Sequence, residues 1–132
     1  MPIIIRRRTR QLRNAVLSGH DHSGADLRGA KLYGLDLHGK VFRGADLSRG
    51  DLTGCNLVGA DLQGADLTAT FLNGAQLMRA NLRDANLTAA CALMTDFSDA
   101  EMNGTILDRV IYDKLTDWPR GILPPSPNRH LA

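Results

Sequence analysis

The chain has 132 residues, a length that suits a single domain. Hydrophobic residues make up 43% of it, which excludes an intrinsically disordered chain, and aromatic residues make up only 5%, which excludes a core built on large rings. The net charge of +2 is nearly neutral, and no apolar run approaches the ~20 residues needed to span a bilayer.

The first segment, residues 1–9, is expected to form a basic N-terminal arm. Its isoleucines, Ile3 to Ile5, are expected to cover the first apolar layer of the fold as a cap, whereas its arginines discourage edge pairing. A run of arginines favours contact with nucleic acid or with an acidic protein surface, although most such runs are simply solvated. No aromatic side chains that could stack on bases accompany them. The predicted basic contact consists of Arg6, Arg7, Arg8 and Arg10.

Residues 10–109 repeat with a period of five. Counting in steps of five from Leu12 to Leu107, leucine occupies 15 of the 20 central positions. The position two before each centre is alanine in 11 of the 20 units, and the residue between is usually Asp or Asn. Glycine is frequent two residues after the centre.

This period excludes both common regular structures. On an α-helix, steps of five would spread the leucines around every side, so no amphipathic stripe would form. On a flat strand, residues five apart would point to opposite faces. A brief extended segment followed by a bend of about 90° satisfies the pattern, and glycine suits such a bend. Four units would then close one square coil, and about five coils would stack ~4.8 Å apart as parallel strands.

The consensus Ala-Asp/Asn-Leu-x-Gly resembles that of the pentapeptide-repeat proteins, and the resemblance extends from Arg10 to Arg109. It implies an all-β fold, the right-handed quadrilateral β-helix, capped at both ends. The right-handed sense comes from the resemblance alone.

The tail, residues 110–132, is predicted to be a C-terminal cap. Its residues from Tyr112 to Pro124 resemble a tail found on many cyanobacterial members of the family, although Ile122 stands where an aromatic residue is usual. We expect Tyr112, Trp118 and Ile122 to cover the last coil, and the side chains beneath them to be Ile106, Ile111 and Leu115.

The sequence lacks the patterns of catalytic and metal sites. His20, Asp21 and His22 supply too few metal ligands, and both histidines and Lys40 occupy inward positions, so the register shifts there or these side chains reach outward. Cys55 is expected in the core and Cys91 on the surface, and two such cysteines form no disulfide framework. A shaft filled by Leu and Ala leaves no catalytic pocket. We predict a cytoplasmic protein that is not an enzyme and needs no cofactor, metal or small-molecule substrate.

The outward positions show one apolar group. Most carry Asp or Asn, which we interpret as solvated side chains. Phe71 replaces the usual acid, and clustered apolar side chains favour a protein contact. The alternative is that the tail folds back over Phe71 and Leu93. The predicted protein-binding face consists of Tyr33, Val58, Phe71, Met78, Cys91 and Leu93.

These features predict a non-catalytic scaffold or adaptor that binds another protein, as part of a larger cyanobacterial photosynthetic or regulatory assembly. One alternative is a DNA mimic that regulates a topoisomerase such as gyrase, as some family members do. Those members are strongly acidic and have phenylalanine at many centres, whereas this chain has a net charge of +2 and leucine centres. A nucleic-acid contact through the basic arm is the remaining alternative.

Overall fold

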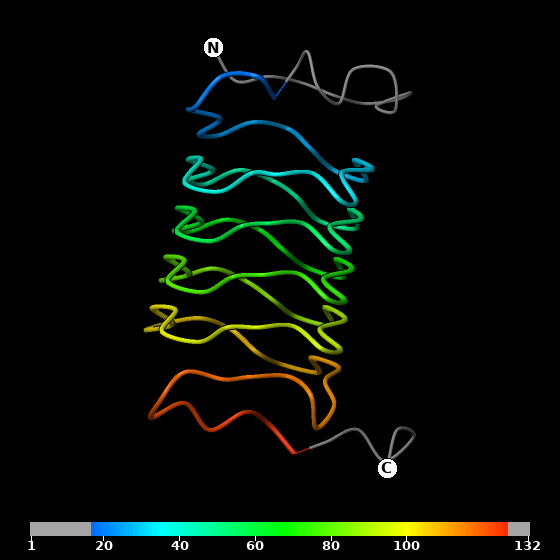
Figure 1. The fold of residues 1–132 in the computed structure, drawn as a ribbon, viewed down its shortest axis with the longest axis vertical. Coiled ribbons are helices and arrows are strands. Elements are labelled where there is room, and N and C mark those ends of the chain that lie inside the picture. The colour runs from blue at the N-terminus through cyan, green and yellow to red at the C-terminus, as the bar shows by residue number, and fades with distance from the viewer. Residues whose placement is uncertain (1–16, 127–132) are drawn as a thin grey trace.

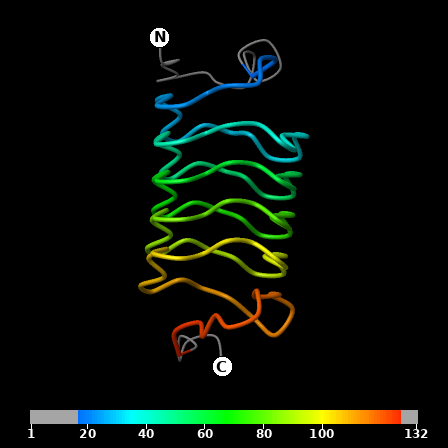
Figure 2. The same ribbon diagram turned by 90° about the vertical axis from the view of Figure 1, so that its left-hand side faces the viewer.

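The computed structural model describes residues 17–126, which wind into a stack of similar coils (Figure 1, Figure 2). Ile3 to Ile5 and the arginines of the predicted basic contact lie outside the described residues. The described part of the chain contains no helix, and therefore none that is long and apolar enough to cross a membrane.

The coils are held in register by parallel bridges between residues 20 apart. The series runs from the bridge of Asp21 with Val41 to that of Cys91 with Ile111, beyond the predicted end of the repeat at Arg109. Twenty residues are four five-residue units, so each unit forms one of four walls. The bridges are isolated, so within residues 17–126 the expected strands are reduced to single bridging residues between bends. The right-handed sense of the coil remains an expectation from the resemblance.

The backbone hydrogen bonds follow the same repeat. The N–H of the central Leu27 donates to the carbonyl of Asp46 in the next coil over 2.8 Å, and the N–H of Asp46 donates back to Ala25 over 2.9 Å. Within a unit, the N–H of Ala30 donates to Leu27 over 3.0 Å and closes the bend. Each coil thus satisfies most of the polar backbone groups of its neighbour, as a buried backbone requires.

The core is the shaft of inward side chains that the five-residue period predicts. Almost every central leucine in the described residues is fully buried, together with the alanines two positions earlier. Phe42 and Phe97 replace leucine at two centres and are also buried. Ala92 is also buried at its expected central position, so its small size causes no shift of register at that unit.

The bends require a left-handed backbone at the second residue after each centre. Glycine adopts it at Gly64, for example, with a φ of 69°. Non-glycine residues adopt it elsewhere, including Ala69 with a φ of 56° and Arg79 with a φ of 59°. Because an L-residue is strained in this region, these units depend on the surrounding coils to hold their geometry.

The first described coil accommodates its inward polar residues without a change of register. His22 is buried, its ring stacks on Phe42 with centroids 5.4 Å apart, and its Nε2 lies 2.9 Å from the carbonyl oxygen of Gly19. Lys40 reaches outward, and its Nζ donates to the same carbonyl oxygen over 2.6 Å. His20 is exposed. The sequence left open either a shift of register or side chains that reach outward. The structure shows the second for Lys40 and His20.

The last coil is one residue longer than the others. Asp96 bridges Asp117, a spacing of 21 residues, so an extra residue enters after Ile111. Ile106 and Leu115 remain 43% and 58% exposed, which contradicts the expectation that the cap covers them. Leu115 lies in the turn that absorbs the insertion and therefore points away from the core.

Candidate functional site

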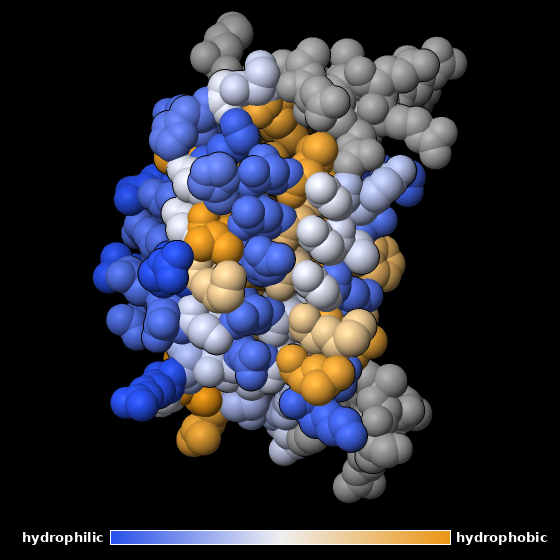
Figure 3. Space-filling model, in the orientation of Figure 1, coloured by the Kyte–Doolittle hydropathy of each residue, from blue (hydrophilic) through white to orange (hydrophobic). Residues whose placement is uncertain are grey.

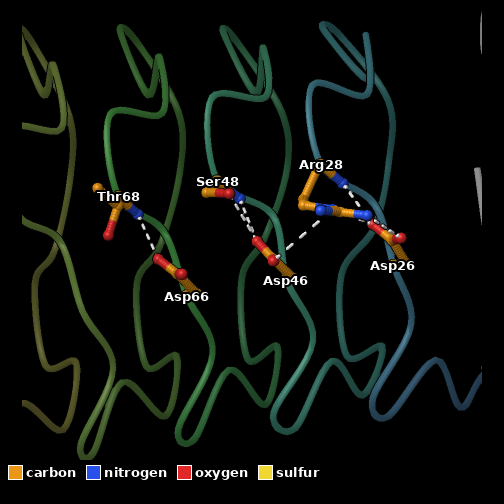
Figure 4. Close-up of polar contacts among 6 residues, drawn as sticks. All are labelled: Asp26, Arg28, Asp46, Ser48, Asp66 and Thr68. Atoms are coloured by element: carbon orange, nitrogen blue, oxygen red, sulfur yellow. Dashed lines mark hydrogen bonds and ion pairs between the residues drawn. The ribbon is translucent and has the colours of Figure 1, made fainter. Parts of the chain in front are cut away.

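The outward Asp and Asn side chains cap the bends of the coil. Asp46 Oδ1 accepts a hydrogen bond from the backbone N–H of Ser48 over 3.0 Å, and Asp66 Oδ1 accepts one from Thr68 over 2.9 Å (Figure 4). This is the local bond by which Asp and Asn favour turns. The same bond forms at Asp21, Asp26, Asp36, Asp51, Asn56, Asp61, Asn81, Asn86 and Asp96.

The interpretation of these residues as merely solvated was therefore incomplete. An Asp or Asn two residues before a bend was the signal in the sequence that could have revealed the cap. The bonds also affect ionisation, because the hydroxyl and backbone N–H of Ser23 lower the pKa of Asp21, and the His38 ring and N–H lower that of Asp36.

Several acids on two of the walls are paired with arginines. Arg28 lies 2.7 Å from Asp26 and 4.0 Å from Asp46, and its hydrogen bond to Asp26 raises the pKa of the guanidinium (Figure 4). Arg43 pairs with Asp61, and Arg83 lies 2.7 Å from Glu101. No group of three or more His, Cys, Asp or Glu within residues 17–126 could hold a metal ion.

Five apolar residues lie together on the outside of the C-terminal half of one wall and its adjoining bend. Phe71 bridges Cys91 and Cys91 bridges Ile111, so three consecutive coils present an apolar residue at the same position. Leu93 and Met94 follow Cys91 in the adjoining bend, and Phe71 and Met94 are 50% and 53% exposed. We call Phe71, Cys91, Leu93, Met94 and Ile111 the apolar patch.

Two members of the apolar patch were missed by the sequence prediction. Ile111 lies one coil beyond Cys91 at the outward bridging position, whereas it was expected beneath the cap because the repeat had been taken to end at Arg109. A further step of 20 residues along the sequence would have found it. Met94 stands where glycine is usual, with a φ of 55°, and this departure was the available signal. On the face drawn in Figure 3, apolar residues lie among polar ones along the whole height of the stack.

The other residues of the predicted binding face lie beside the apolar patch or away from it. Val58 and Met78 are half-buried and stack in consecutive coils on the neighbouring wall, where the N–H of Gly59 donates to Met78 over 2.9 Å. Tyr33 is 40% exposed but is separated from Leu93 by two intervening coils. Tyr33 therefore lies on the same wall as the apolar patch, with one coil between its own coil and that of Phe71.

The two cysteines differ in their surroundings. Cys55 is buried, and its Sγ lies 2.9 Å from the carbonyl oxygen of Leu32, so it takes an inward position as a small core residue. Cys91 is half-buried within the apolar patch, and the two thiols are not joined in a disulfide.

The residues of the predicted cap stack at the C-terminal end. The Trp118 ring lies on Phe97 with centroids 4.9 Å apart and an interplanar angle of 11°, and Tyr112 meets it edge-on at 5.5 Å. Ile122 packs against the core, and the Tyr112 hydroxyl donates to the carbonyl of Pro125. The described part of the tail, residues 110–126, leaves Phe71 half exposed.

Known proteins share this repeat. The chain matches the family described as pentapeptide repeats in eight copies, over residues 11–49, 23–59, 45–84, 60–92 and 80–111. Among curated proteins, none matches the chain significantly.

Solved structures of pentapeptide-repeat proteins are similar to it. Rfr23 from the cyanobacterium Cyanothece 51142 is 31% identical, with 74% of this chain and 60% of that one covered and a TM-score of 0.47. The protein alr5209 from Nostoc PCC 7120 is 30% identical, with 93% and 92% covered and a TM-score of 0.39. A protein from the Arabidopsis thaliana thylakoid lumen is 27% identical, with 75% and 72% covered and a TM-score of 0.39.

Proposed function

The chain belongs to the family of pentapeptide-repeat proteins, and on that premise we propose that it is a non-catalytic scaffold that binds another protein through the apolar patch. The observation that carries the proposal is the run of Phe71, Cys91 and Ile111 in consecutive coils. Other walls place mainly Asp, Asn or Gln at this position.

The rigidity of the wall suits this role. Phe71 and Cys91 are fixed by the bridges to their neighbouring coils, and the side chains that alternate with them, such as Leu72 and Ala92, are fully buried. A partner would therefore meet a surface that needs little ordering on binding, which lowers the entropic cost of association. Exposed apolar side chains with a polar rim are typical of such contacts.

The alternative functions have less support. The net charge is +2, and arginines pair with several of the outward acids, so the chain lacks the strong net negative charge that a DNA mimic requires. The predicted nucleic-acid contact lies outside the described residues. We also propose a cytoplasmic location, because thiols such as Cys55 and Cys91 that form no disulfide suit a reducing compartment.

The substitution Phe71→Asp tests the proposed contact. Aspartate is the commonest residue at this outward position, and here it would be free to accept a bond from the N–H of Asn73, as Asp51 does from Thr53 one coil earlier. The fold should therefore tolerate the change. Gln76→Asp is the matched control, because Gln76 is an exposed bridging residue on the next wall.

The measurement is quantitative affinity purification from the source organism with the wild type and both variants. We expect a partner that is retained by the wild type and by Gln76→Asp but lost by Phe71→Asp, while all three unfold at similar temperatures. Equal recovery of every partner by Phe71→Asp would reject the apolar patch as the binding surface.

A further inference from the structure

The sequence contains two Asn-Gly pairs, and both occupy the same place in the five-residue unit. Asn73–Gly74 and Asn103–Gly104 are each the two residues that follow a centre. Both glycines are left-handed, with φ values of 70° and 76°. The dipeptide and its left-handed bend are therefore the same at both sites, whereas the flanking residues and the surroundings differ.

The first pair is held by the next coil. The N–H of Gly74 donates to the carbonyl of Leu93 over 2.9 Å, and Asn73 Oδ1 accepts a hydrogen bond from the N–H of Leu93 over 3.0 Å. Both the backbone nitrogen of the glycine and the side-chain amide of the asparagine are thus engaged.

The second pair lies on the open edge of the last complete coil. The one-residue insertion makes Pro124 the residue that would follow Asn103 in the next coil, but the described tail forms no bridge back to this wall, and the adjacent Leu123 is 93% exposed. Within residues 17–126 the N–H of Gly104 has no acceptor and the Asn103 side chain has no hydrogen-bond partner. Asn103 and Gly104 are both exposed.

We propose that Asn103 is a site of spontaneous deamidation. The fold protects Asn73 from the same reaction. The backbone nitrogen of Gly104 attacks Cγ of Asn103, a new C–N bond closes a five-membered succinimide, and the bond from Cγ to Nδ2 breaks. The nitrogen of Gly104 gives up its proton, and the amide leaves as ammonia. Water then opens the ring at either carbonyl and yields aspartate or isoaspartate at position 103.

The reaction needs a glycine nitrogen that is not committed to a hydrogen bond and a side chain that can rotate toward it. Gly104 and Asn103 meet both conditions, whereas Asn73 and Gly74 would first have to break two hydrogen bonds with Leu93. Two such bonds correspond to a difference in rate of about tenfold to a hundredfold.

The product would alter the C-terminal edge. The new carboxylate would lie in an acidic neighbourhood, two residues from Glu101 and next to Gly104, whose α-carbon faces the carboxylate of Asp84. Isoaspartate would also lengthen the main chain by one methylene within a bend whose register is set by five-residue units. The last complete coil would therefore gain negative charge and lose regularity.

The experiment incubates the full chain at mildly alkaline pH and follows both asparagines by peptide mapping and mass spectrometry. We expect conversion at Asn103 to exceed that at Asn73 by about tenfold to a hundredfold. In urea the two rates should approach each other, because both sites share the Asn-Gly pair and the hydrogen bonds that protect Asn73 are lost on unfolding. Equal rates in the folded protein, or faster conversion at Asn73, would overturn the proposal.

The variant Asn103→Ser provides a second test of the assignment to Asn103. Serine occupies the corresponding position at Ser48 and Ser98, so the bend should accept it. This variant should release ammonia at only the slow rate of the protected site, about a tenth or less of the wild-type rate. Unchanged ammonia release would place the reaction elsewhere and reject the assignment to Asn103.

Discussion

The left-handed bends allow a test of how much backbone chirality contributes to stability. Gly64 has a φ of 69°, and a Cβ added there would meet no atom within 4 Å. The substitution Gly64→Ala therefore changes the backbone preference without a steric clash. Ala69, at the next corner, already adopts a φ of 56°, so Ala69→Gly is the reverse experiment.

The expected magnitude follows from two opposing terms. An L-residue in the left-handed region costs roughly 1–2 kcal/mol, whereas replacing glycine by alanine returns about 0.4–1 kcal/mol by restricting the unfolded chain. We therefore expect Gly64→Ala to lower the free energy of unfolding by about 1 kcal/mol. Ala69→Gly should raise it by a similar amount, and the double variant should lie near the wild type. Gly64→Asn should cost less than Gly64→Ala, because asparagine tolerates this region.

Urea denaturation followed by circular dichroism measures these differences. With a slope of about 2 kcal/mol per molar urea, a change of about 1 kcal/mol moves the midpoint by about 0.5 M. The slope itself should stay constant, because none of these changes alters the surface exposed on unfolding. A loss above about 3 kcal/mol for Gly64→Ala, or destabilisation by Ala69→Gly, would contradict the reasoning.

Two further substitutions test polar contacts. Thr95 is fully buried and its Oγ1 donates to the carbonyl of Leu72 over 2.7 Å, so Thr95→Val should lower the free energy of unfolding by about 1 kcal/mol, whereas Thr95→Ser should retain the bond. The N–H groups of Met94 and Leu115 bind the Asp113 carboxylate and lower its pKa, so its stabilisation is present at neutral pH and lost as the pH falls below about 4 through the folded-state pKa. The difference in urea midpoint between the wild type and Asp113→Asn should therefore shrink on acidification, and a constant difference would contradict the assignment.

The interior of the fold was predictable from the sequence because its period leaves few alternatives. Leucines such as Leu47 and Leu67 must share an axis if residues five apart are all to be buried, and the structure buries them completely. The spacing also predicted that Cys55 takes an alanine-like position. These conclusions required only the alternation of inward and outward residues.

The ends of the repeat were less predictable because their side chains depart from the consensus and make contacts that the repeat does not specify. Nothing in the pattern indicated that Lys40 would reach the carbonyl of Gly19. The extra residue before Asp117 shifts the five-residue register, so counting in steps of five did not find the last unit. That unit is nevertheless visible in the sequence, because Thr116, Asp117 and Trp118 repeat the small-acidic-large triplet of the earlier units. The candidate site was found in part, since Phe71 departs from the consensus, but its extent depended on where the last coil ends.

The 20-residue spacing restricts how such a rod can change in length over evolution. Loss or gain of a complete coil leaves each column aligned, whereas one additional unit rotates all that follows by a quarter turn. An insertion of five residues between Phe71 and Cys91 would stack Phe71 on Asn86 and carry Cys91 and Ile111 to the next wall. A surface assembled across several coils can therefore survive only those duplications and deletions that comprise whole turns.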